Sequence, residues 1–263
     1  MLKFGLKLWS TNTDYYYEEA KRLYAEGVFH YIELYIVPDT TATIEKWKIL
    51  KEEYGIPFNL HAPHFMHGVN LAKREKKDSN LRIYKQVKEF ADALNVGYII
   101  FHGGVDGNIE ETAKQLKSFE EPRAILENKP FDAIPNKMGG VFCRGATFDE
   151  IKYVLDEVKC GFCLDIGHAI CSANSQGIDK WRFIEQLKQF DPSSYHLTDL
   201  RDINSKYDSH AHIGHGFMDI EKALSFIEVG KCLTIETEKN FKDNLSDFEI
   251  DVKNLWCTIY DKN

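Results

Sequence analysis

Short apolar runs alternate with amphipathic segments along the whole chain, and the two patterns predict two kinds of element. Eight of the runs read as short buried strands. They are residues 4–8, 31–36, 57–61, 98–102, 123–127, 161–165, 195–198 and 233–236. Strands that alternate with helices favour a parallel sheet, and eight such units predict a right-handed (β/α)8 barrel, the TIM barrel. We expect residues 1–263 to form this one domain.

Helix signals lie between the predicted strands. The segment 44–53 has helical periodicity and is followed by Gly55, which suits the left-handed residue that closes a helix. Three pairs have the spacing of a capping box at a helix start: Asn108 with Glu111, Thr147 with Glu150, and Ser246 with Glu249. The stretch 129–145 lacks any periodicity and predicts a loop over one end of the barrel.

Composition narrows the class of protein. Apolar residues make up 43% of the chain and charged residues 28%, and no apolar run approaches the roughly 20 residues that cross a bilayer. The first residues show no secretory signal pattern, so we expect a cytoplasmic protein without a membrane partner. The six cysteines are scattered and predict reduced core thiols, the pair Cys160 and Cys163 included. A net charge of −8 disfavours DNA as a partner, although DNA stays possible.

Candidate chemistry gathers where the predicted strands end. In TIM barrels the carboxyl ends of the strands face the active site. Histidines and acids stand at these ends or in the loops that follow them: His61, His102, Glu127, Asp165, His168, His196, Asp208, His210 and Glu236. Clustered imidazoles and carboxylates repel or desolvate one another unless a cation holds them. A mixed set without organised thiols favours zinc or manganese.

These residues resemble the motifs of the endonuclease IV branch of the xylose isomerase-like barrels, from the third predicted strand to the eighth. His102 resembles the histidine of an H-P-G motif and Glu127 the glutamate of an E-N motif. Asp165 with His168 is similar to a D-x-x-H pair. The remaining positions match in the same way: His61 on strand 3, His196 in an H-L-N-D motif, Asp208 and His210 in a D-x-H motif, and Glu236 on strand 8.

The resemblance implies a site with two or three divalent ions, zinc first and manganese second. Glu127 would bridge two of them. One ion would be completed by Asp165, His196 and Glu236, a second would be bound by His61 and His102, and a third by His168, Asp208 and His210.

The chain departs from the branch beside these ligands. The E-N-T-A-G motif is ENKPF here, D-T-C-H is DIGH, N-D-[ST]-K is TDLR, and D-R-H is DSH. After the second predicted strand, where the nuclease has a loop that probes DNA, the chain has VPDTTAT without a basic residue. These departures keep metal binding and argue against DNA. They bring the chain closer to the sugar isomerases and epimerases, which often have D-x-G-H and H-x-x-D motifs.

Hydrolysis of a phosphate ester is the first functional hypothesis, and it depends on the ligands of the third ion. Metal ions a few Å apart would lower the pKa of a bridging water toward about 7 and steady the leaving oxygen. Arg201 could contact a phosphate, and His64 could stack on a base or sugar ring.

The alternative is isomerisation or epimerisation of a sugar or sugar phosphate. One ion bound by Glu127, Asp165, His196 and Glu236 would polarise a carbonyl, with Glu127 and Glu236 as the acid/base pair. A third hypothesis is a binding or scaffold barrel without chemistry. It ranks last because every matched position keeps a residue that can bind a metal. Glu33, inside the second predicted strand, fits either an ion-paired barrel residue or a substrate contact.

Overall fold

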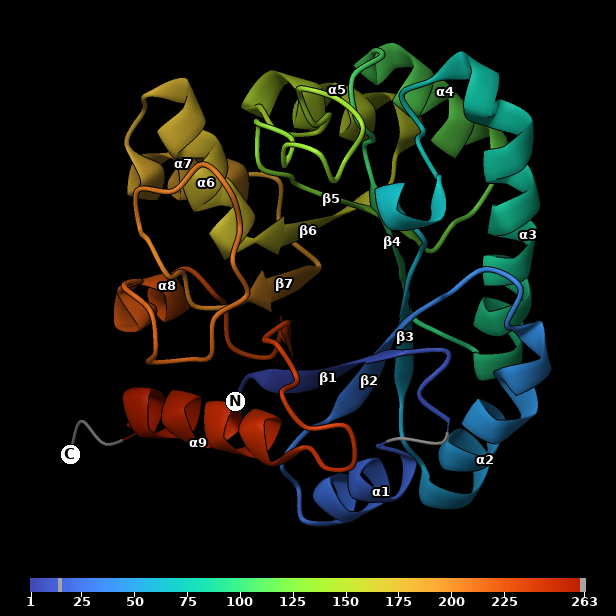
Figure 1. Cartoon of the computed structure of the whole chain (residues 1–263), viewed down its shortest axis with the longest axis vertical. Coiled ribbons are helices and arrows are strands. Elements are labelled where there is room, and N and C mark those ends of the chain that lie inside the picture. Colours follow the sequence, from blue (N-terminus) through green and yellow to red (C-terminus); the bar gives the residue numbers. More distant parts are fainter. Residues whose placement is uncertain (14–15, 261–263) are drawn as a thin grey trace.

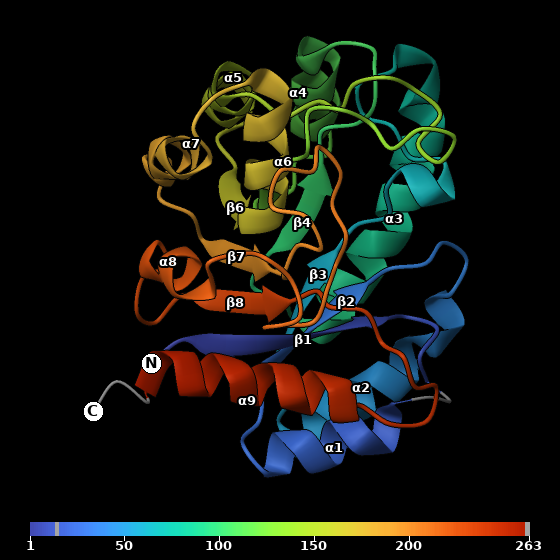
Figure 2. The same ribbon diagram turned by 60° about the vertical axis from the view of Figure 1, so that its left-hand side comes forward.

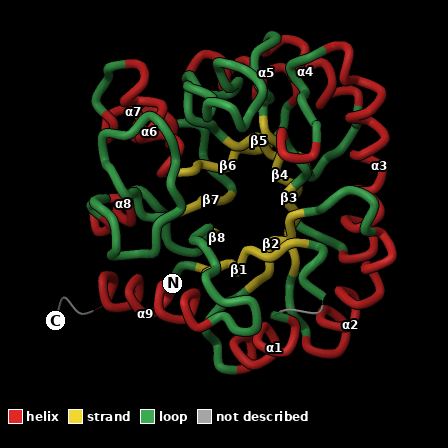
Figure 3. Tube along the Cα trace, viewed as in Figure 1, coloured by secondary structure: helices red, strands yellow, loops and turns green. Residues whose placement is uncertain are grey.

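The eight predicted strands form a closed barrel. The computed structural model describes residues 1–13 and 16–260. Its strands are parallel and pair in chain order, from β1 to β8 and back to β1, so they make the ring of Figure 3. They are β1 Lys3–Trp9, β2 Tyr31–Tyr35, β3 Phe58–His61, β4 Ile99–His102, β5 Ala124–Glu127, β6 Gly161–Asp165, β7 Ser194–Leu197 and β8 Cys232–Ile235. The prediction of a (β/α)8 barrel is confirmed, and every predicted strand end lies within one residue of the observed end.

Helices surround this ring (Figure 1). They are α1 Tyr17–Ala25, α2 Ile44–Tyr54, α3 Lys77–Leu94, α4 Ile109–Ser118, α5 Phe148–Val158, α6 Ile166–Gln176, α7 Lys180–Lys188, α8 Ile220–Ser225 and α9 Ser246–Tyr260. The last helix returns to the start of the chain and runs alongside β1 (Figure 2), where the rings of Phe4 and Trp256 meet edge to face with centroids 5.6 Å apart.

Local signals explain where several helices begin and end. Gly55 closes α2 with a φ of 72°, in the left-handed region where glycine is not strained. The predicted caps at Asn108 and Thr147 are confirmed, because each side chain accepts a hydrogen bond from the backbone three residues on. The prediction for Ser246 is wrong. Its backbone N–H and its hydroxyl both donate to the side-chain oxygen of Asn244, so Ser246 is already the first residue of α9.

The alternation of side chains along each strand divides the barrel into two environments. On β2, Ile32 and Leu34 belong to the apolar core between the strands and the helices. The alternate residues Tyr31 and Glu33 face the interior, where Tyr31 hydrogen-bonds Thr234 and Glu33 is fully buried. Polar side chains therefore line part of the barrel interior, beside a small apolar cluster of Tyr98, Ile100, Ile125 and Cys163, and the main apolar core lies between the strands and the helices.

Loops at the carboxyl ends of the strands complete the mouth of the barrel. The predicted loop 129–145 connects β5 to α5 and forms antiparallel bridges from Val105 to Cys143 and from Asp132 to Phe142. The first bridge fixes it against the loop between β4 and α4, and the second joins two parts of the loop 129–145 itself. Among the described residues, no helix is long and apolar enough to cross a membrane.

Candidate metal centre

The carboxyl end of the barrel brings most of the predicted ligands into one cluster. His61, His102, Glu127 and Asp165 are the last residues of β3 to β6. Strand register places neighbours side by side, with His102 opposite Glu127 and Asp165 opposite His196. Parallel strands of a barrel therefore deliver residues from distant parts of the sequence to one polar surface.

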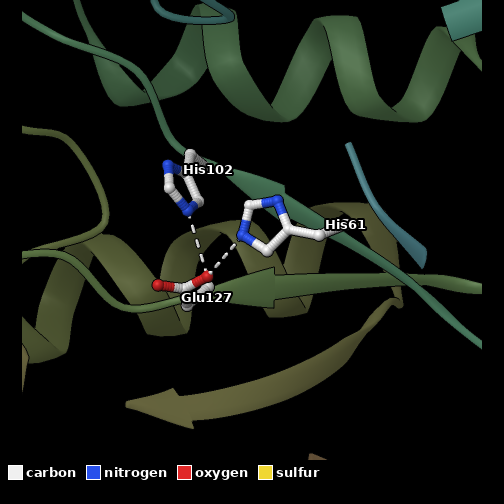
Figure 4. Close-up of side chains that lie close together, drawn as sticks. All are labelled: His61, His102 and Glu127. Carbon is white, nitrogen blue, oxygen red and sulfur yellow. Dashed lines mark hydrogen bonds and ion pairs between the residues drawn. The ribbon is translucent and has the colours of Figure 1, made fainter. Parts of the chain in front are cut away.

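Glu127 lies at the centre of one part of the cluster (Figure 4). Its Oε2 lies 3.0 Å from Nε2 of His61 and 3.0 Å from Nε2 of His102. Its Oε1 lies 2.9 Å from Nδ1 of His168. Only 1% of Glu127 is exposed to solvent. A buried carboxylate among three imidazoles is an arrangement that can bind one or more divalent ions.

His196 lies at the centre of the other part. Its Nε2 donates to Oε2 of Glu33 at 3.0 Å, which fixes the ring. Its Nδ1 has no hydrogen-bond partner among the described residues. Three carboxylates approach this nitrogen, Glu236 at 3.2 Å, Glu127 at 3.7 Å and Asp165 at 3.9 Å. An imidazole nitrogen with three carboxylates around it and no hydrogen-bond partner fits a divalent ion, with Glu33 as the partner that orients the ligand.

Burial and neighbouring charges displace the pKa values of these groups. Burial opposes the charge of Glu127, but Lys129 and His102 lower its pKa well below the ordinary range. At Asp165 burial prevails and raises the pKa to about 6. Burial opposes the charge of His168, yet Asp165 and other acids raise its pKa to about 10. A divalent ion bound here would favour the deprotonated forms of Asp165 and His168, because its positive charge lowers the pKa of each ligand.

The predicted ligands of a third ion are less closely gathered. Asp208 lies 2.8 Å from Nε2 of His210 and 3.5 Å from Nε2 of His168. The side chain of His210 is 41% exposed, so this group lies at the rim of the cluster. Among the described residues, three groups have ligand atoms that all lie within 4.8 Å of one another, and the trio of His168, Asp208 and His210 is not one of them. The three groups are His61, His102, Glu127; Glu33, His196, Glu236; and Glu127, Asp165, His196.

Two buried lysines belong to the cluster, and the sequence analysis missed both. Nζ of Lys7 lies 2.6 Å from Glu33 and 2.5 Å from Glu236, so Glu33 is an ion-paired barrel residue. Lys129 extends its amine toward Glu127, His102 and His168. The available signals were a lone lysine inside the apolar run of β1 and a lysine directly after the Glu127–Asn128 pair.

A cavity of about 630 Å³ opens above the cluster, within the size range of sites for small molecules. Both predicted substrate contacts line it. The ring of His64 stacks on the ring of His102, with centroids 4.7 Å apart and planes 2° apart. Arg201 is already paired, because its guanidinium donates to Glu238 at 2.6 Å and to the carbonyl of Ser209 at 2.9 Å.

Known proteins with similar sequences or folds carry two kinds of name. A relative from Sulfurihydrogenibium sp., named probable endonuclease 4, is 27% identical over 243 residues, which cover 83% of this chain and 85% of the relative. Among solved structures, a D-tagatose 3-epimerase-like protein has a TM-score of 0.70 at 19% identity, covering 97% of this chain and 95% of that protein. An AP endonuclease, family 2, from Brucella melitensis has a TM-score of 0.68 at 16% identity and covers 99% of both chains.

The family itself follows from a match over most of the chain. The sequence profile described as xylose isomerase-like TIM barrel matches residues 20–247, a segment that runs from α1 into α9 and includes all nine predicted ligands. The chain therefore belongs to the xylose isomerase-like TIM barrel family.

Proposed function

We propose that the chain is a metal-dependent isomerase or epimerase that acts on a sugar or sugar phosphate. The observation that carries the proposal is the unpaired Nδ1 of His196, surrounded by the carboxylates of Glu127, Asp165 and Glu236. These four side chains are the set that would bind one zinc or manganese ion. A divalent ion bound there would polarise the carbonyl oxygen of a substrate.

Glu127 and Glu236 are suited to move the proton. Glu127 ends β5 and Glu236 follows β8, three strands away in the barrel, so they reach the ion from different sides. Burial opposes their charge, but His196 and Lys7 lower the pKa of Glu236, and Lys129 and His102 lower that of Glu127. Both glutamates are therefore carboxylates at neutral pH. Either can accept a proton from the carbon next to a carbonyl, and the glutamic acid so formed can return it to the neighbouring carbon, which completes an isomerisation. In an epimerisation the opposite glutamate, after taking a proton from water, would deliver it to the other face.

The cavity supports a small substrate rather than a polymer. Its volume of about 630 Å³ accommodates a monosaccharide with a phosphate. The loop after β2 carries no basic residue and the net charge is −8, and both features disfavour a nucleic acid as substrate.

Hydrolysis of a phosphate ester is the second candidate. The name of the Sulfurihydrogenibium relative favours it, and so does the group of His61, His102 and Glu127, which could bind a further ion. This reaction needs at least one ion in addition to that of His196 if two ions are to hold the phosphate.

Proton exchange with solvent separates the two candidates. The metal-loaded protein is incubated in D₂O with ketoses, aldoses and their phosphates, and NMR records deuterium at the carbons beside the carbonyl. We expect exchange with at least one sugar, its loss in Glu236→Gln, and its retention in Glu238→Gln, a matched change of a rim glutamate. Cleavage of an abasic oligonucleotide or an aryl phosphodiester, without exchange into any sugar, would instead support hydrolysis.

A further inference from the structure

The amine of Lys129 occupies the middle of the ligand cluster. Its Nζ lies 3.2 and 3.3 Å from the two ring nitrogens of His168, 3.5 Å from Nε2 of His102 and 3.4 Å from Oε1 of Glu127. Only 7% of Lys129 is exposed. Its backbone N–H donates to the carbonyl of Gly145 at 3.0 Å, which anchors the residue at the start of the loop between β5 and α5. The side chain therefore belongs to the barrel interior.

These contacts connect two of the predicted ion positions. His102 was predicted as a ligand of the second ion and His168 as a ligand of the third, and Glu127 as the bridge between ions. The ammonium of Lys129 reaches all three of these side chains. Its positive charge lies between side chains where a metal ion would otherwise supply one.

A divalent ion and this ammonium would repel each other strongly. An ion bound to Nε2 of His102 at about 2.1 Å would lie within about 6 Å of Nζ, because that nitrogen is 3.5 Å from Nζ. Like charges at such a distance repel strongly where protein excludes water. The position beside His196 is different, because Nδ1 of His196 and Lys129 have no contact within 4 Å among those of the described residues. Glu127 turns its Oε2 toward His196 and its Oε1 toward Lys129, so an ion beside His196 would bind the oxygen that faces away from the ammonium.

We propose that the Lys129 ammonium takes the place of the second and third ions, so that the chain binds one divalent ion, at Glu127, Asp165, His196 and Glu236. The proposal rests on the metal binding proposed above and goes beyond it by assigning the number and place of the ion. The sequence agrees, because Lys129 stands where the resembled E-N-T-A-G motif has an uncharged threonine.

The ammonium then has a role of its own in the reaction. Lys129 lines the cavity beside Glu127, so its N–H groups can donate to a hydroxyl or carbonyl oxygen of the substrate. A second divalent ion would coordinate the phosphoryl oxygens directly with twice the charge of an ammonium. One ammonium gives less charge, and this suits a neutral sugar oxygen better than a phosphodiester under attack.

The test counts ions with and without this amine. Protein stripped with chelator and desalted is titrated with Zn²⁺ and with Mn²⁺ in a calorimeter, and bound metal is measured by elemental analysis after gel filtration. We expect one equivalent in the wild type, two or three in Lys129→Thr, and one in Lys129→Arg. Lys137→Thr, a change of an exposed lysine on the same cavity, is the control and should leave one equivalent.

Two further variants locate the ion. In the wild-type background, His196→Asn should abolish the single equivalent and His61→Asn should leave it. Two or more equivalents in the wild type, or one in Lys129→Thr, would overturn the proposal for Lys129. No metal in either chain would overturn that proposal and the metal-dependent function together. One equivalent at His196 without solvent exchange into any sugar keeps the role of Lys129 and overturns the proposed reaction.

Discussion

Lys7 and Lys129 are two buried lysines at the mouth of one barrel, and they are held in different ways. The amine of Lys7 makes close ion pairs with two carboxylates, at 2.6 Å to Glu33 and 2.5 Å to Glu236. Among the described residues, the amine of Lys129 has no hydrogen bond or ion pair shorter than 3.2 Å, and its nearest polar partners are imidazole nitrogens. Lys7 therefore makes two short ion pairs with carboxylates, whereas Lys129 makes longer contacts with side chains that are predicted metal ligands.

We infer from this difference that the charge of Lys7 is needed for the structure of the site, whereas a metal ion could replace the charge of Lys129. Lys7 neutralises Glu33, which in turn orients His196 through a hydrogen bond of 3.0 Å. Removing that charge would disturb the scaffold of the proposed ion site. Lys129 neutralises Glu127, whose other partners are the imidazoles of His61, His102 and His168. A metal ion bound to the same side chains could also neutralise Glu127.

The largest expected effect is that of Lys7→Met on stability. The change leaves the buried carboxylates of Glu33 and Glu236 without their shared counterion, and breaking a buried pair in this way costs about 3–5 kcal/mol. Chemical denaturation at neutral pH measures the loss. Lys3→Met, at the exposed start of the same strand, should change the unfolding free energy by less than about 0.5 kcal/mol. A loss of unfolding free energy below about 1 kcal/mol for Lys7→Met would show that the charge of Lys7 is not needed to stabilise the site.

A smaller and metal-dependent effect is expected for Lys129→Met. In chelator, the loss of a loosely held cation beside Glu127 should cost about 1–3 kcal/mol. With zinc at roughly 100 times its dissociation constant, a second bound ion would add about 2.7 kcal/mol to the variant alone and close most of the gap to the wild type. The same denaturation curves with and without zinc measure this. If zinc leaves the difference in unfolding free energy between Lys129→Met and the wild type unchanged, no metal replaces the amine. As a control, the corresponding difference for Lys7→Met should be the same with and without zinc.

A third lysine of the cavity extends the comparison to pH. Lys239 has no ion pair within 4 Å among the described residues, and burial lowers its pKa from 10.5 to about 8 although Glu236 acts in the opposite direction. The folded protein thus binds this proton less tightly than the unfolded chain. Its stability should therefore be reduced below about pH 8 and recover as pH rises toward 10.5.

The expected recovery is on the order of 1 kcal/mol, because one pKa unit corresponds to about 1.4 kcal/mol and the side chain is partly exposed. Unfolding free energies of the wild type and Lys239→Met at pH 7, 8, 9 and 10 measure it. The difference between the two proteins should shift in favour of the wild type as pH rises. Parallel curves would show that Lys239 keeps its ordinary pKa in the folded protein.

The sequence predicted the barrel well because local patterns determine it. Each strand is an apolar run of only a few residues, and helix signals such as Gly55 and the cap at Thr147 separate the runs. The position of Asp165 at the end of its strand followed from the same pattern. Since parallel strands align their carboxyl ends, the meeting of that residue with His196 could be anticipated as well.

The two lysines could not be anticipated in this way. A lysine is usually solvated, and nothing local indicates that the side chain of Lys129 turns inward after Asn128. That direction depends on the loop between β5 and α5, which is anchored by a backbone hydrogen bond to Gly145, sixteen residues later in the chain. The separation of Asp208 and His210 from the main cluster also depends on loop geometry, which spacing in the sequence does not determine.

The smallest expected effect on stability is that of Arg201→Gln, and it sharpens the contrast between rim and interior cations. The side chains of Arg201 and Glu238 are 57% and 45% exposed, so their ion pair should contribute less than about 0.5 kcal/mol.

The effect of Arg201→Gln on catalysis should depend on the substrate. If Arg201 leaves Glu238 to bind a phosphate, kcat/KM for a sugar phosphate should fall roughly tenfold, and that for the unphosphorylated sugar should not change. Steady-state rates with the two substrates measure this ratio. Glu238→Gln frees the guanidinium from its carboxylate, so it should raise kcat/KM for the sugar phosphate relative to that for the unphosphorylated sugar. Equal losses on both substrates in Arg201→Gln would instead show that Arg201 only holds its loop and does not bind the phosphate.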